Sequence, residues 1–234
     1  MRLWIAAAAM LTCTALAQTA GDLRDLSVGI ASTQLPTEGY FAFACGSDGG
    51  TPLEPVDDWT DFRRCARDRA TGLYEVYYEY DDESEYTQRM LADVLGDGER
   101  LGARPFYGTR VAGHPVVLSV LFDEAGVAQA IRAVTDQRAD VSSRRNAYLL
   151  RVAIMNSYGP DGWACTDTPL AQGETAVGQF FVNSRCEKSV GPRRMVVEAH
   201  LYRKAGQTGF DRAGDEVEGD FVSVGRWEIW NSAR

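Results

Sequence analysis

The chain has little of what most catalytic sites are built from. It contains only two histidines, His114 and His200, and the GxSxG, P-loop, GxGxxG and HExxH motifs are all missing. No CxxC pair occurs, and neither histidine lies near a cysteine in the sequence, so we expect no cysteine-based metal site. These absences make an enzyme less expected than a binding protein, and they give no reason to expect a metal or a cofactor.

Long apolar runs are also scarce, because only the first 20 residues contain one. Arg2 is followed by the almost wholly apolar stretch 3–16, which runs into a small-x-small sequence at 15–17. This pattern predicts a secretory signal peptide at residues 1–17. It is shorter than the roughly 20 apolar residues of a membrane-spanning helix. We therefore expect an exported mature chain that begins near Gln18 and has no transmembrane segment.

Basic residues are outnumbered by acidic ones, 24 to 33, which gives a formal net charge of −9. An acidic chain is repelled by nucleic acid and anionic lipid, so nucleic-acid binding is not expected. Lys188 and Lys204 are the only lysines, an arginine bias that is typical of GC-rich bacterial genomes, and no N-glycosylation sequon occurs. The expected location is the bacterial periplasm or the medium outside the cell, where an envelope protein or a glycan would be the partner.

Four of the five cysteines lie outside the predicted signal peptide, at positions 45, 65, 165 and 186. An even number of cysteines in an exported chain favours disulfides. Four cysteines allow three pairings, and two nearly equal separations favour the local pairs Cys45–Cys65 and Cys165–Cys186. In the chain-entropy account, closing a loop of this size stabilises a fold by about 3 kcal/mol.

Strand patterns dominate the rest of the chain. Alternation and turn signals predict strands at 39–45, 73–81, 162–165, 178–182, 195–202 and 221–230, and a hairpin of 114–122 with 127–135.

Helical signals are fewer. A helix is predicted over 141–158, capped by Asp140 or Ser142 and ended by Gly159, with a second helix at 84–95 and a helical turn at 57–65. The expected fold class is α+β, an antiparallel sheet built from β-hairpins with one or two packed helices.

The two halves of the mature chain resemble each other in the order of their features. Each reads cysteine, loop, Arg-Cys, a short polar stretch and then a strand that contains glutamate. The sequence therefore suggests two related, disulfide-pinned halves, 18–140 and 141–234, which together make one compact domain or two units. The alternative is that two disulfide-pinned hairpins look alike by chance.

Three ionisable side chains are the candidates for catalysis: Glu75, Glu198 and His200. Alternation places Glu198 and His200 on one face of a strand, about 7 Å apart, a spacing that suits a general base or a metal ligand. A solvated polar face gives the same pattern. Glu75 joins them only if the two halves pair in one sheet and bring it close to Glu198.

Aromatic residues gather on two predicted strands. In the strand at 73–81 both faces carry tyrosine, so one set is exposed unless the sheet is covered on both sides. Tyr77, Trp227 and Trp230 are therefore candidates for contact with a protein or for stacking on a sugar.

Two functions follow from these observations. The leading hypothesis is an exported, disulfide-stapled, non-enzymatic envelope protein that binds another macromolecule, as a protein partner or an inhibitor. The alternative is a small hydrolase that acts on envelope glycan with a carboxylate and His200.

Overall fold

The computed structural model describes residues 22–80, 108–204, 206, 208–210, 216–218 and 221–232. The predicted signal peptide at 1–17 and the predicted helix at 84–95 lie outside these residues.

Strands are the main regular elements of the described chain. Their bounds are β1 (Tyr40–Cys45), β2 (Tyr74–Tyr80), β3 (Thr109–Val111), β4 (His114–Phe122), β5 (Ala128–Thr135), β6 (Ala164–Asp167), β7 (Glu174–Thr175), β8 (Val182–Val190), β9 (Arg193–Lys204), β10 (Thr208–Phe210), β11 (Glu216–Glu218) and β12 (Val222–Asn231). The helical elements are η1 (Ser32–Gln34), η2 (Trp59–Arg64), α2 (Val141–Arg145) and α3 (Leu149–Ser157).

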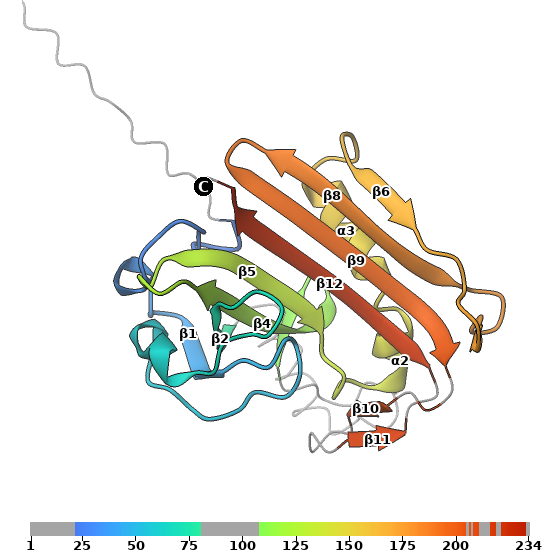
Figure 1. The fold of residues 1–234 in the computed structure, drawn as a ribbon, viewed down its shortest axis with the longest axis horizontal. Coiled ribbons are helices and arrows are strands. Elements are labelled where there is room, and N and C mark those ends of the chain that lie inside the picture. Colours follow the sequence, from blue (N-terminus) through green and yellow to red (C-terminus); the bar gives the residue numbers. More distant parts are fainter. Residues whose placement is uncertain are drawn as a thin grey trace, which may run out of the picture.

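A ten-stranded antiparallel sheet with the main order β1-β2-β4-β5-β12-β9-β8-β6 forms the body of the molecule (Figure 1). The two short strands β3 and β7 pair with β4 and β9, and β10 and β11 form a separate ribbon. This architecture, with its short helices, confirms the predicted α+β class with an antiparallel sheet.

Each half of the chain contributes four consecutive strands of the main order. β1, β2, β4 and β5 come from the first half, and β6, β8, β9 and β12 come from the second. The last strands of the two sets, β5 and β12, pair with each other, and Ile131 lies opposite Ile229. We call this pairing the seam. The order is therefore similar in both halves. The segments matched from the sequence, however, are β2 and β9, which hold different positions in their sets.

One face of the sheet, here called the core face, carries the main apolar core. Alternation along β2 places Tyr78 on this face, and the strand register continues its row through Leu118, Ala133 and Trp227. All four are buried. Because the row crosses the seam between β5 and β12, the two halves share one core.

Different elements cover the core face in the two halves. In the first half η2 lies on it, and the Trp59 ring packs edge-on against Tyr78 with 5.0 Å between centroids. In the second half α3 packs on β12 and β9 and buries Leu150 and Ile154. Figure 1 shows the sheet from the opposite side, with α2 and α3 behind the strands.

The predicted continuous helix over 141–158 is wrong, because the helix breaks between α2 and α3. The Ser223 hydroxyl of β12 donates a hydrogen bond to the Arg144 carbonyl, and the N–H of Ala147 donates to the same carbonyl at 2.9 Å. The cap is one of the two predicted, since the Asp140 carboxylate accepts the N–H of Ser143 at 2.9 Å. A tertiary contact therefore interrupts a segment whose local pattern is helical.

The predicted strand at 178–182 is also wrong over most of its length. Val177 and Phe180 exchange two backbone hydrogen bonds, 2.9 and 3.1 Å long, across a tight turn. Gly178 has a φ of +66°, which glycine adopts without a steric penalty. β8 starts only at Val182. Its sequence does not resemble a strand, because most of its residues are polar.

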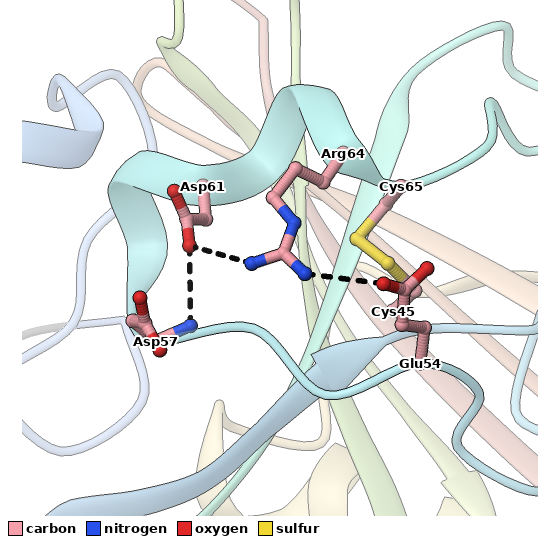
Figure 2. The surroundings of a disulfide bond; sticks show 6 residues. All are labelled: Cys45, Glu54, Asp57, Asp61, Arg64 and Cys65. Atoms are coloured by element: carbon pink, nitrogen blue, oxygen red, sulfur yellow. Dashed lines mark hydrogen bonds and ion pairs between the residues drawn. A yellow bond between two sulfur atoms is a disulfide. The ribbon is translucent and has the colours of Figure 1, made fainter.

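Both predicted disulfides are present. Cys45–Cys65 ties the end of β1 to the residue after η2, and Arg64 in the same loop pairs with Glu54 at 3.1 Å and with Asp61 at 3.3 Å (Figure 2). Cys165–Cys186 joins residues that lie directly opposite each other in β6 and β8. Each disulfide therefore closes a local loop within one half.

Candidate functional site

The face of the sheet opposite α3, here called the charged face, carries ionisable side chains from five strands. They are Glu75 on β2, Arg132 on β5, Arg226 and Glu228 on β12, Glu198 and His200 on β9, and Arg185 on β8.

Arg132 is the centre of a buried ion cluster on this face. Its side chain is 2% exposed, and its guanidinium lies within 3.4 Å of carboxylate oxygens of four residues. The distances are 2.9 Å to Asp48, 3.1 Å to Asp68, 3.4 Å to Glu75 and 2.8 Å to Glu228. Such burial requires paired charges, because an isolated ion in the interior is very costly.

The loop after β1 covers this cluster. The N–H of Asp48 donates to Glu75 at 2.8 Å, while the Asp48 carboxylate pairs with Arg226 at 2.7 Å. A Cβ atom at Gly46 or Gly49 would collide with the Glu75 or Val134 side chain, so the loop lies this close only because glycine occupies both positions. The loop thereby keeps water from Arg132.

Ionised carboxylates are favoured in this cluster. Burial by itself would raise the pKa of Asp68, but hydrogen bonds from Thr71 and the charge of Arg132 outweigh it and lower the pKa. Burial likewise opposes ionisation of Glu228, and Arg132 with Arg226 lowers its pKa. Glu75 also accepts a hydrogen bond from Ser119 at 2.7 Å. These carboxylates already have hydrogen-bond and ion-pair partners, so a structural role in holding the loop suits them.

Glu198 and His200 lie side by side on the charged face of β9. The His200 Nε2 atom is 4.0 Å from a Glu198 oxygen, and the Nδ1 atom is 3.1 Å from the Asn183 amide oxygen. The His200 contact, opposed by burial and aided by Arg185, lowers the pKa of Glu198 to about 2. Glu198 also forms an ion pair with Arg185. At neutral pH Glu198 is therefore a paired carboxylate with no proton to donate.

Glu75 does not join this pair. The two halves do pair in one sheet, but β2 and β9 are separated by β4, β5 and β12. Four strand spacings of about 4.8 Å put Glu75 roughly 19 Å or more from Glu198. The two carboxyl groups of glycosidases lie no more than about 9.5 Å apart, so Glu75 and Glu198 do not form such a pair.

The three aromatic candidates have different surroundings. Tyr77 is buried on the charged face beside Ala44 and Val117, and its hydroxyl donates to Glu79. Trp227 is buried in the main core. Trp230 is half-buried and donates its indole N–H to Glu228 at 2.9 Å. Of the three, only Trp230 keeps a surface that a ligand could touch, and the sheet is covered on both sides at Tyr77.

A different aromatic group lies where β8 begins and β9 ends, and one of its members is exposed. Phe180 lies in the tight turn before β8 and is 63% exposed. The next residue, Phe181, packs against Tyr202 with 6.5 Å between ring centroids, and Tyr202 stands edge-on to His200 at 6.4 Å. We call Phe180, Phe181, Tyr202 and His200 the turn surface. It combines an exposed aromatic side chain with polar neighbours.

One signal in the sequence indicates the turn surface, although the prediction of a strand at 178–182 did not use it. Gly178 precedes two consecutive phenylalanines, and a glycine with positive φ marks a turn that can present the side chains after it to solvent. Leu170, 43% exposed, lies on the same connection between β6 and β8.

The described residues contain neither a cluster suited to a metal ion nor a membrane-spanning helix. No group of three or more His, Cys, Asp or Glu side chains is arranged to hold a metal ion in this part of the chain. Among the helices at these positions, none has the length and apolar character needed to cross a membrane. Comparison of the chain with protein-family models, with curated proteins and with solved structures finds no match.

Proposed function

We propose that this is an exported bacterial envelope protein that acts by binding a protein partner, and that the partner docks on the turn surface. The observation that carries the proposal is the exposure of Phe180 on a hydrogen-bonded turn. The two backbone hydrogen bonds order the turn, so less backbone entropy is lost when the aromatic side chain enters a partner's pocket. The partner therefore presents an apolar pocket that accepts a phenylalanine ring.

Export is supported by the disulfides and by the sequence. Two disulfides in one chain are typical of oxidising compartments outside the cytoplasm. The apolar stretch at the start of the sequence has the pattern of a signal peptide. Both features favour the periplasm or the medium as the location of the folded protein.

The glycan-hydrolase alternative has less support from the geometry. A general acid must hold a proton at the working pH, and the low pKa of Glu198 keeps it ionised there. Glu75 is buried in the Arg132 cluster, where its oxygens accept hydrogen bonds from Asp48 and Ser119. Ion pairing on a binding surface is the role that suits Glu198 better.

Site-specific photo-cross-linking in cells tests the docking surface. A photoreactive amino acid replaces Phe180 in one variant and Leu53 in a control, because Leu53 is 59% exposed but belongs to the loop after β1. We expect one discrete cross-linked protein from position 180 and none of that size from position 53. Mass spectrometry then identifies the cross-linked partner. The purified partner should bind the wild-type protein at least about tenfold more tightly than it binds the Phe180→Ser variant.

Three outcomes would overturn the proposal. They are equal cross-linking from both positions, cross-linking to glycan alone, and unchanged affinity of the partner for Phe180→Ser. Loss of a glycan-cleaving activity in Glu198→Gln would favour the hydrolase instead.

A further inference from the structure

The two disulfides differ in the solvent exposure of their cysteines. Cys45 and Cys65 are both buried, beneath the loop that Arg64 also closes. Cys186 is completely buried, but Cys165 is exposed on β6, the strand at the end of the sheet order. An external thiolate must reach a sulfur atom to open a disulfide, and of the two disulfides only the second has an exposed cysteine.

A positive charge lies beside the buried sulfur of the exposed pair. The guanidinium of Arg151 on α3 is 3.7 Å from the Cys186 Sγ atom. Within the part of the chain that the structure describes, Arg151 makes no ion pair with a carboxylate, and its Nε atom is buried without a hydrogen-bond partner. A nearby cation stabilises a thiolate, and a more stable thiolate leaves faster in exchange. Arg151 is thus placed to favour Cys186 as the leaving group.

We propose that Cys165–Cys186 is a thiol–disulfide exchange site for a dithiol reductant, whereas Cys45–Cys65 is a permanent staple. The reductant's thiolate attacks Cys165 Sγ, a mixed disulfide forms, and the Cys165–Cys186 bond breaks with its electron pair going to Cys186. The second thiol of the reductant then resolves the mixed disulfide. The reductant ends as a disulfide, and this protein ends with two thiols after Cys165 and Cys186 each take up a proton.

The short strand β6 depends on this bond. Among the described strands it pairs with β8 alone, over four residues that are all exposed. A short edge strand with so little buried surface frays easily when a covalent tie is lost. Reduction therefore frees β6 and uncovers the edge of β8, while α3 and the core face keep their packing.

Differential alkylation of the native protein tests the proposal. The folded, oxidised protein is incubated with dithiothreitol without denaturant, quenched with iodoacetamide at intervals and mapped by mass spectrometry. We expect Cys165 and Cys186 to become alkylated at least about tenfold faster than Cys45 and Cys65. Equal rates, or faster labelling of Cys45 and Cys65, would overturn the proposal without bearing on the docking at Phe180.

Two variants separate the charge from simple accessibility. Arg151→Gln should slow reduction about three- to tenfold, while Arg145→Gln, which removes the same charge from exposed α2, should leave the rate unchanged. Arg151→Lys keeps the charge and should retain most of the rate. Equal rates for Arg151→Gln and Arg145→Gln would refute the role of Arg151. Near-UV circular dichroism verifies that each variant is folded.

Discussion

Replacement of Arg132 by methionine should be among the most damaging single changes on the charged face. Methionine fills a similar volume, but it leaves the carboxylates of Asp68, Glu75 and Glu228 together without their shared cation. Removal of one partner from a buried ion pair costs about 3–5 kcal/mol. This is a large part of the roughly 5–15 kcal/mol that stabilises a typical folded protein.

The matched control is Arg185→Met on the same face. Arg185 also contacts two carboxylates, Glu187 and Glu198, but its side chain is 47% exposed. Exposed ion pairs contribute about 0–1 kcal/mol. With an m value of about 2–3 kcal/mol/M, the urea midpoint should fall by about 1–2.5 M for Arg132→Met and by less than about 0.5 M for Arg185→Met.

The pH dependence gives a second signature in the same urea experiment. In the wild type the folded pKa values of Asp68 and Glu228 are lowered from 3.8 and 4.5, so their stabilisation is fully present above about pH 4.5 and is lost as the pH falls through the folded values. Without Arg132 both folded pKa values rise, because burial is then opposed only by Thr71 at Asp68 and by Arg226 and Trp230 at Glu228. The loss in free energy of unfolding of Arg132→Met relative to the wild type should therefore shrink between pH 7 and pH 5, because the carboxyls take up protons.

Two results would refute this reasoning. One is a cost of less than about 1 kcal/mol for Arg132→Met at pH 7, which would mean that the cluster is hydrated rather than buried. The other is a deficit that stays constant from pH 7 to pH 5, which would mean that uncompensated charge is not its cause. If Arg132→Met does not fold at pH 7, its folding is tested at pH 5. Recovery of the folded state there would support uncompensated charge as the cause, and failure to fold at both pH values would refute it.

Two further predictions concern the same face. Carbon-13 NMR should find that the pKa of the Glu198 carboxyl is about 2. Arg185→Met should raise this pKa. A pKa near 4.5 in the wild type would contradict the ion pair. Gly39→Ala and Gly49→Ala both place alanine at positive φ, which costs about 1–2 kcal/mol, but only Gly49→Ala also collides with Val134 and should lose a further 1–3 kcal/mol or so in urea unfolding. Equal costs would show that the loop moves aside freely.

The strands with strong local patterns were predictable from the sequence. β2 alternates and is rich in aromatic residues, and β4 and β5 carry β-branched residues and are joined by a clear hairpin turn. β8 was not, because one of its faces is exposed and its polar residues resemble a loop. The break between α2 and α3 was also beyond local reasoning, since Ser223, which binds the Arg144 carbonyl, is distant in sequence.

The charged face shows the same division. The pairing of Glu198 with His200 follows from strand alternation, which is a local property. The surroundings of Arg132 do not, because Asp68 lies 64 residues before it and Glu228 lies 96 residues after it. No local signal marks an arginine as buried when its partners come from such distances.

The position of β12 sets an order of assembly. It follows every other described strand in the chain, yet it lies between β5 and β9 in the sheet. Until it is in place, no strand pairing joins the first half to β6, β8 and β9. Each of these two parts already holds its own disulfide, so oxidation can precede joining. Arg132 gains Glu228 only when β12 arrives, and a chain stopped before Val222 would be oxidised but still in two parts.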